Sequence, residues 1–318
     1  MTRQHDRRAG RQRATGTTPA LVDSHVHFWD RRRFYYAWLA SADSALRRDF
    51  LPQDLNSELA SLTRVTPAGS VFVQADCRAE QSEGEVQWIH QLADDGADVL
   101  AVVAHVPLDK GADCAPDLEH LVRTAPLVSG VRRLLQDEPP GFVTDPSLVA
   151  GVRLLAAHGL TMDLCVRQHQ LGEVVDLVDR CPDVLFVLDH LGKPSVTAED
   201  FAPWASELTR LAARPHVRCK LSGLLSEAPA GRRTTSALRP WLEHALTAFG
   251  PSRCMFGSDW PVLTSVAGYH QWCETVLDVV ADLPEEHRTS VLSGTATATY
   301  DPVNRAARAK DPCHGPDG

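Results

Sequence analysis

Three histidines and one aspartate could form a single catalytic or metal-binding centre. His25 and His27 lie one residue apart at the end of the apolar segment 21–28, and alternate residues of a strand point to the same face. His190 ends the segment 183–190, and Asp259 lies near the end of the segment 253–260. Imidazole nitrogens and a carboxylate can hold one zinc ion, and imidazoles without a metal can stabilise an oxyanion. The sequence therefore indicates acid–base or metal-assisted chemistry, with the choice between them open.

Each of these residues also has a structural interpretation when it is taken alone. An HxH pair is common, and a lone histidine such as His190, on one face with Phe186 and Leu188, is more often a hydrogen-bonded core residue. We expect that face to point into the interior of the fold. Asp259 is more informative, because a carboxylate after an apolar strand is costly to bury unless it is paired or bound to a metal. The four residues together favour a functional site.

Eight short apolar segments with strand character are separated by longer segments with helical spacing. The strand candidates are 21–28, 70–76, 99–108, 128–135, 160–166, 183–190, 216–223 and 253–260. The helix candidates include 84–96, 146–159, 171–182 and 239–251, and the long interval 29–69 requires an additional loop.

Strands that alternate with helices indicate parallel βα units. We therefore expect an α/β fold, a single (β/α)8 TIM barrel over residues 20–302, with its catalytic groups at the carboxyl ends of the strands. An open doubly wound sheet is the alternative, but no glycine-rich phosphate motif follows the first segment.

The composition excludes several classes of protein. The 318 residues are 43% hydrophobic and 23% charged, with a net charge of −9. This balance fits a globular domain and gives no basic footprint for nucleic acid. No apolar stretch reaches the roughly 18 residues that would suggest a membrane span. The Arg-rich residues 1–19 and the polar residues 303–318 are expected to be disordered extensions.

The eight cysteines are expected to be reduced thiols. None forms a CxxC pair, and Cys165, Cys219 and Cys254 lie within strand candidates. Cysteines at such positions behave as small apolar core residues. Because no secretory signal is visible either, we expect a cytoplasmic protein.

Seven segments, in order along the chain, match the pattern of a known family. They are VDSHVHFWD (22–30), RDFLPQDL (48–55), DLCVRQHQL (163–171), LDHLGKP (188–194), KLSGL (220–224), FGSDWPV (256–262) and SGTATATY (293–300). The chain resembles the amidohydrolase superfamily, in its amidohydrolase-2 branch of L-fuconolactonase-like and L-rhamnonolactonase-like proteins. This resemblance implies a distorted (β/α)8 barrel and the hydrolysis of a sugar lactone.

The resemblance also limits the number of metal ions. Many members of the superfamily hold two metals bridged by a carboxylated lysine on strand 4, but segment 128–135 contains no lysine. Segment 160–166 lacks the histidine that would end strand 5. We therefore expect at most one divalent metal, most plausibly zinc, and metal-independent activity stays open. The candidate ligands are His25, His27, His190 and Asp259.

The implied mechanism is the attack of water on the lactone carbonyl, with Asp259 as general base. The three histidines, or a bound metal, would polarise the carbonyl and stabilise the oxyanion. Residues beside these motifs could bind the sugar and are Gln74, Arg132, His169, Lys193, Trp29 and Trp260.

Three other functions compete with this interpretation. They are a single-metal non-oxidative decarboxylase of an aromatic acid, another amidohydrolase-type hydrolase, and a binding protein built on an inactive barrel. The missing histidine of strand 5 weighs against the decarboxylase, and the presence of Asp259 and the HxH pair weighs against the binding protein. We expect a small-molecule sugar lactone as partner rather than nucleic acid or a membrane, and a homo-oligomer is left open.

Overall fold

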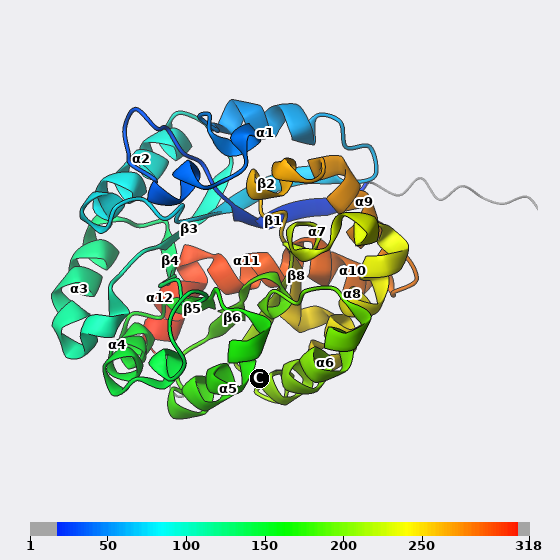
Figure 1. Ribbon diagram of the computed structural model, residues 1–318. Helices are drawn as coiled ribbons and strands as arrows, with labels where there is room; N and C mark the ends of the chain where they lie inside the picture. Colours follow the sequence, from blue (N-terminus) through cyan, green and yellow to red (C-terminus); the bar gives the residue numbers. More distant parts are fainter. Residues whose placement is uncertain (1–17, 311–318) are drawn as a thin grey trace, which may run out of the picture.

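The computed structural model describes residues 18–310, which form a barrel of eight parallel strands (Figure 1). The strands are β1 (Ala20–Val26), β2 (Thr66–Val73), β3 (Val99–Ala104), β4 (Val128–Val131), β5 (Thr161–Leu164), β6 (Phe186–Leu188), β7 (Val217–Leu221) and β8 (Cys254–Phe256). Each strand pairs with the next one along the chain. After β8 the chain returns to β1 through a parallel bridge between Val26 and Trp260, where the His27 amide donates to the Trp260 carbonyl over 2.8 Å. The predicted (β/α)8 barrel is confirmed.

Helices between the strands cover the outside of the barrel (Figure 1). They are α1 (Pro52–Leu59), α2 (Ser82–Asp94), α3 (Ala115–Thr124), α4 (Pro146–Ala157), α5 (Leu171–Arg180), α6 (Ala198–Ala212), α7 (Leu224–Glu227), α8 (Thr235–Phe249) and α9 (Tyr269–Val280). Side chains before three of them, α4, α6 and α8, satisfy free backbone amides. The Asp145 carboxylate accepts from the Ser147 amide in α4, and the Thr197 hydroxyl accepts from the Asp200 amide in α6. Such caps fix where a helix begins.

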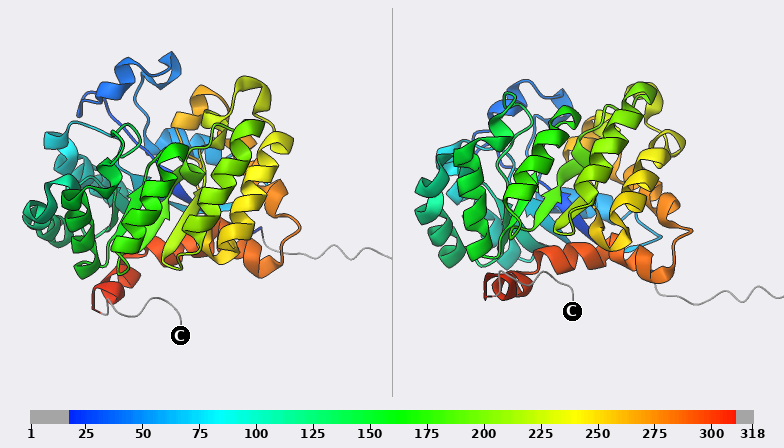
Figure 2. Two further views of the ribbon diagram at one scale, coloured as in Figure 1. Left: turned by 60° about the horizontal axis from the view of Figure 1, so that its bottom comes forward. Right: turned by 90° about the horizontal axis from the view of Figure 1, so that it is seen from below.

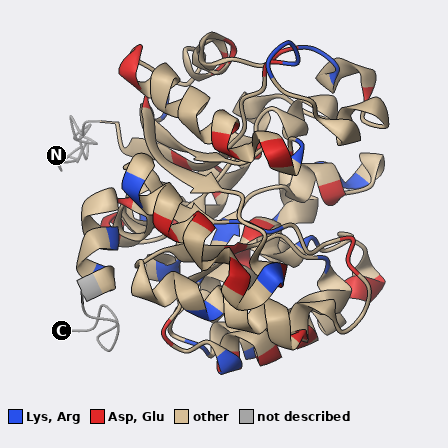
Figure 3. Cartoon of the chain, turned by 90° about the vertical axis from the view of Figure 1, so that its left-hand side faces the viewer, with Lys and Arg blue, Asp and Glu red and all other residues tan. Residues whose placement is uncertain are grey.

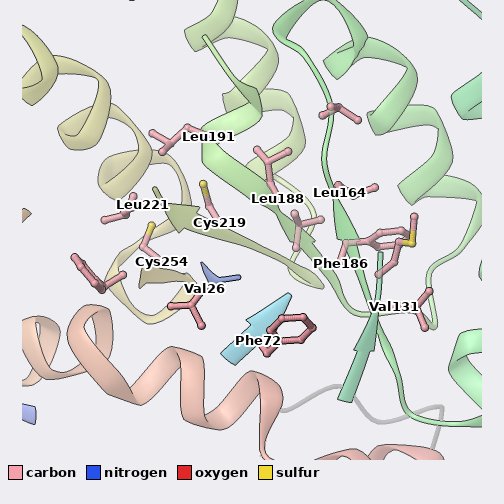
Figure 4. Close-up of a cluster of buried hydrophobic side chains, with 14 of the residues drawn as sticks. Val26, Phe72, Val131, Leu164, Phe186, Leu188, Leu191, Cys219, Leu221 and Cys254 are labelled. Atoms are coloured by element: carbon pink, nitrogen blue, oxygen red, sulfur yellow. The ribbon is translucent and has the colours of Figure 1, made fainter. Parts of the chain in front are cut away.

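Alternate residues of the strands face the barrel interior and the helix layer. The interior holds a small apolar cluster of Val22, Val71, Val73, Ala101, Val103, Val187, Met255, Ala296 and Tyr300. The residues between them in the strands, such as Phe72 and Leu188, belong to the larger core that the helices cover (Figure 4). Gly130 of β4 lies where the interior is crowded, since a Cβ there would sit 2.3 Å from Thr161 Oγ1. Only glycine fits this position.

A helical segment closes the amino-terminal end of the barrel. It consists of α10 (Glu285–Thr289), a π-helical turn at Ser290–Gly294 and α11 (Thr295–Tyr300), which run beneath the strands (Figure 2). The Tyr300 hydroxyl donates to Asp163 Oδ2 over 2.6 Å. Polar groups inside the barrel are therefore anchored from this end.

The carboxyl-terminal tail differs from the expectation. Disorder was predicted from residue 303, but α12 covers Pro302–Lys310. Arg305 donates to the Val128 carbonyl over 2.6 Å, and Arg308 donates to the Gly159 carbonyl over 3.1 Å. The sequence did not reveal this helix because it is held by guanidinium groups that bind backbone oxygens of the barrel, and its apolar residues, such as Val303, are exposed. The other parts of the predicted extensions, 1–17 and 311–318, lie outside the described residues.

The distribution of charges on the surface and the state of the cysteines agree with the expectations from the composition. In the view of Figure 3, Lys and Arg are interspersed with Asp and Glu over the helices. Within residues 18–310 no helix is long and apolar enough to cross a membrane. The seven described cysteines are free, and six of them are buried, while Cys313 lies outside the described residues.

Candidate active site

The two histidines of the HxH motif point into the mouth of the barrel because β1 has one extra residue, relative to β2, between Asp23 and Val26. Asp23 pairs with Ser70 on β2, and the next pair is Val26 with Phe72, so three steps along β1 match two steps along β2. A bulge of this kind redirects the side chains around it. It gives His25 its inward direction at the end of the strand.

His190 and Asp259 reach the same place from tight backbone turns. β6 ends at Leu188, and His190 has a left-handed backbone with a φ of 53°. Gly223 leaves room for its ring, since a Cβ on Gly223 would lie 2.7 Å from the imidazole. Asp259 follows β8 with a φ of 63°, and its amide donates to the His25 carbonyl over 3.0 Å. Non-glycine residues keep such conformations only where the surrounding structure enforces them.

The face assigned to His190 from the sequence is wrong, although the residue does reach the site. The expected interior face contained Phe186, Leu188 and His190. Instead Val187 joins the interior cluster, and Phe186 and Leu188 belong to the outer core. The next interior residue is Asp189, and His190 enters the mouth because the chain turns after β6.

The four predicted residues meet at one point. The Nε2 atoms of His25 and His27 lie 3.2 Å apart. The Oδ1 atom of Asp259 lies 3.7 Å from the first and 3.5 Å from the second. It lies 3.8 Å from His190 Nε2. Ligand atoms around a tetrahedral zinc ion, with bonds of about 2.0–2.1 Å, are roughly 3.3–3.4 Å apart. The observed separations therefore fit a single divalent ion after small shifts.

The outer nitrogens of two imidazoles are held by hydrogen bonds. His27 Nδ1 lies 2.7 Å from the Val73 carbonyl oxygen, which can only accept. The proton of neutral His27 is therefore on Nδ1, and the lone pair of Nε2 points into the site. His190 Nδ1 lies 2.8 Å from Ser222 Oγ. Among the described residues, His25, His27 and Asp259 form one group with the spacing of metal ligands, and His190 forms a second such group with His25 and Asp189. The donor set fits a divalent metal.

Burial and charge set the protonation states of the centre. Desolvation lowers the pKa of His190 to about 4 and holds the pKa of His25 well below its usual range. Burial would raise the pKa of Asp259, but the imidazoles of His190, His27 and His25 outweigh this, and the pKa is lowered from its ordinary value. At neutral pH the imidazoles of His25 and His190 are thus neutral beside the Asp259 carboxylate, as metal ligation and base catalysis require.

Four charged residues lie directly beneath His25, and to three of them, Asp163, Asp189 and Lys220, the sequence analysis gave no role. Asp189 Oδ1 is 3.2 Å from His25 Nδ1 and 3.0 Å from Lys220 Nζ. The Lys220 ammonium also donates to Asp163 Oδ2 over 2.6 Å, and Arg132 Nη1 donates to Asp189 Oδ2 over 3.2 Å. All four charged side chains are buried. The sequence signal for these residues is the two-residue alternation along β5, β6 and β7, because these charged residues alternate with apolar residues of the outer core.

Three of the predicted substrate-binding residues, Gln74, Arg132 and Lys193, lie around the centre. Arg132 Nη2 donates to the Gln74 carbonyl oxygen over 2.6 Å, and Arg132 Nη1 lies 3.4 Å from His25 Nε2. The Gln74 Nε2 and Arg132 Nε atoms are buried without a hydrogen-bond partner among the described residues. Lys193 Nζ donates to Gln136 Oε1 over 2.5 Å. Buried donors without partners are suited to bind oxygens of a ligand.

The other three predicted binding residues lie apart from these donors. Trp29 and Trp260 are buried, and their rings pack against Phe50 with centroid distances of 5.0 and 5.5 Å. Trp29 Nε1 donates to the Arg48 carbonyl over 2.6 Å. The structure thus uses both rings to pack the loop after β1 rather than as an exposed wall. His169 is exposed on the short turn Gln168–Gln170.

Comparisons with known proteins agree with this geometry. The amidohydrolase family model matches residues 22–301. An L-fucono-1,5-lactonase of Burkholderia multivorans is 35% identical over 300 residues, which cover 88% of this chain and 95% of that protein. An L-rhamnono-gamma-lactonase of Scheffersomyces stipitis is 28% identical over 200 residues, which cover 55% of this chain and 59% of that protein.

Solved structures show the same fold. A crystal structure of an amidohydrolase from Burkholderia multivorans with bound zinc has a TM-score of 0.78 and 34% identity, covering 88% of this chain and 99% of that one. A 5-carboxyvanillate decarboxylase of Sphingomonas paucimobilis has a TM-score of 0.55 and 14% identity, covering 89% of this chain and 98% of that one, which is a likeness of fold alone. With the family model spanning nearly the whole barrel, the chain belongs to the amidohydrolase family.

Proposed function

We propose that this protein hydrolyses a small sugar-acid lactone. The support is its similarity to the L-fucono-1,5-lactonase of Burkholderia multivorans along most of both chains. The single structural observation that carries the proposal is the position of Asp259, whose Oδ1 atom lies 3.5–3.8 Å from three imidazole nitrogens. A carboxylate and three nitrogen groups at one point can activate water and polarise a carbonyl together.

Asp259 is the general base in this proposal. Its carboxylate takes a proton from water, and the water oxygen forms a bond to the lactone carbonyl carbon. An imidazole N–H of His25 or His190 that faces the carbonyl oxygen would stabilise the negative charge that develops there. The bond from the carbonyl carbon to the ring oxygen then breaks, and protonated Asp259 returns the proton to that ring oxygen. The product is the open hydroxy acid, with all atoms of lactone and water retained.

We infer that a divalent metal, zinc first, is held by His25, His27, His190 and Asp259. When bound, such an ion would act as a Lewis acid on the carbonyl oxygen and would lower the pKa of water. The support is the spacing of the four ligand atoms together with the neutral state of His25 and His190.

Gln74, Arg132 and Lys193 are proposed to hold the oxygens of the sugar. A lactone is small and rich in hydroxyl groups, so its pocket needs convergent donors more than a wide apolar surface. The unpartnered atoms Gln74 Nε2 and Arg132 Nε meet this requirement. We infer the cytoplasm as location from the free, mostly buried cysteines, which suit a reducing compartment.

The test is acid release from a panel of five- and six-carbon aldono-lactones, followed with a pH indicator beside amide and aromatic-acid substrates. We expect turnover of lactones of the fucono, rhamnono or galactono type and little reaction with the amides. Turnover confined to amides, or release of CO2 from an aromatic acid, would contradict the proposal.

A further inference from the structure

A buried group of charged side chains inside the barrel contacts the candidate metal ligand His25. Lys220 Nζ contacts Asp163 Oδ2 at 2.6 Å and Asp189 Oδ1 at 3.0 Å. Arg132 Nη1 contacts the other oxygen of Asp189 at 3.2 Å. Two carboxylates and two cations therefore balance each other in a region closed to solvent. None of these groups acts as acid or base in the proposed reaction.

His25 Nδ1 has two neighbours that demand opposite protonation. Lys220 Nζ lies 3.2 Å away, and Asp189 Oδ1 also lies 3.2 Å away. An ammonium group can only donate, and a carboxylate can only accept. If Lys220 donates to Nδ1, the proton of the neutral ring is on Nε2. If Asp189 accepts from Nδ1, the proton is on Nδ1, and Nε2 has a free lone pair.

The two arrangements differ in what they place on Nε2 of His25, at the other side of the ring. His27 Nε2, which carries a lone pair because Nδ1 donates to Val73, lies 3.2 Å from His25 Nε2. When Lys220 donates to His25, the Nε2 proton of His25 can be donated to His27, so both ring nitrogens of His25 have a partner. When Asp189 accepts from His25, two lone pairs face each other with Arg132 Nη1 3.4 Å from His25 Nε2, and a divalent cation between the two imidazole nitrogens would satisfy both lone pairs.

We propose that Lys220 and Asp189 compete for the Nδ1 atom of His25 and thereby set how tightly the centre binds a divalent cation. Lys220 stabilises the metal-free centre, and Asp189 stabilises the metal-bound centre. Both are positioning residues that act through His25. This inference rests on the proposed metal centre, but not on the identity of the lactone.

Two variants should shift the affinity for zinc in opposite directions. The double variant Asp163→Asn/Lys220→Met removes one negative and one positive charge together, so the net charge of the interior is kept while His25 loses the competing donor. We expect it to bind zinc about tenfold more tightly than the wild type. Asp189→Asn removes the acceptor, and loss of such a partner typically weakens metal binding by roughly 10–100-fold. Tyr300→Phe is the matched control, because Tyr300 contacts Asp163 but not His25, and should change the affinity less than threefold.

The measurement is competition for zinc against a chromophoric chelator, with circular dichroism to confirm that each variant is folded. Nitrogen-15 shifts of histidine in the wild type give a second readout, with the His25 signal assigned through its loss in a folded His25→Gln variant. We expect His25 to carry its proton on Nε2 in metal-free protein and on Nδ1 after zinc is added.

Several results would overturn the inference. These are equal or weaker zinc binding by the folded double variant, unchanged binding by Asp189→Asn, or a proton on Nδ1 of His25 already in the metal-free protein. Lactone turnover by a wild type that binds no zinc, with no zinc bound by the double variant, would overturn this inference and leave the proposed function standing. Opposite shifts in zinc affinity for the two variants, without lactone turnover by the wild type, would support this inference and overturn the proposed function.

Discussion

Glu85 in α2 gives a pH dependence of stability that can be worked out from the structure. Its side chain is buried beneath the loop after β2, where Oε1 accepts from the Tyr36 hydroxyl over 3.2 Å and Oε2 from the Ala75 amide over 3.3 Å. Burial raises the pKa of Glu85 from 4.5 to about 7, against the smaller opposing effects of these hydrogen bonds and of Arg132.

The direction of this pH dependence follows from comparing the pKa of Glu85 in the folded and unfolded chains. Because the pKa of Glu85 is higher in the folded protein, its contribution is fully favourable below pH 4.5 and is lost as the pH rises through about 7. The full difference of about 2.5 pKa units corresponds to about 3 kcal/mol. Between pH 5 and pH 8 the cost to the free energy of unfolding is about 2.5 kcal/mol.

The perturbation is Glu85→Gln, measured by urea denaturation at pH 5 and pH 8. The stability of the variant relative to the wild type should rise by about 2.5 kcal/mol between the two values, whatever the constant cost of the new amide. Glu80→Gln is the control for the substitution itself, because Glu80 is exposed. A constant difference for Glu85→Gln, within about 0.5 kcal/mol, would refute the reasoning.

Two further predictions concern the metal centre. Purified protein should bind about one equivalent of zinc, measured by elemental analysis after dialysis, and two tightly bound ions per chain would contradict the single centre. Gly223→Ala should lower both zinc affinity and lactone turnover, since the new Cβ would lie 2.7 Å from the His190 ring at a φ of 70°. The matched variant Gly231→Ala, where no atom lies within 4 Å of the added Cβ, should behave as the wild type, and equal behaviour of the two variants would contradict the role given to Gly223.

Much of the fold could be predicted because the strands and helices follow simple periodicities. Eight apolar segments in alternation with helices were enough for the barrel, and the extra loop was expected in the interval 29–69, where α1 and two short 3-10 turns now lie. The tail could not be predicted in this way. Arg305 and Arg308 hold α12 through backbone carbonyls of other elements, and no local pattern reports such contacts.

The four central residues of the candidate site could be predicted from the sequence, but the backbone features that orient them could not. His25, His27, His190 and Asp259 follow strands, so their meeting at one end of the barrel follows from parallel topology. The inward direction of Asp189 continues the alternation from Val187, whereas His190 reaches the site only because the chain turns after β6 through left-handed residues. A sequence shows neither a bulge nor a turn of this kind directly, because both are enforced by the surrounding packing.

The most direct test of the central claim is the kcat of acid release from the best lactone for the wild type and for Asp259→Asn. If Asp259 takes the proton from water, the substitution should keep the circular dichroism spectrum and lower kcat on the order of 10³-fold. Asp183→Asn is the control, because Asp183 is an exposed carboxylate before β6, and it should retain wild-type turnover. A folded Asp259→Asn variant with more than about a tenth of wild-type kcat would contradict the account.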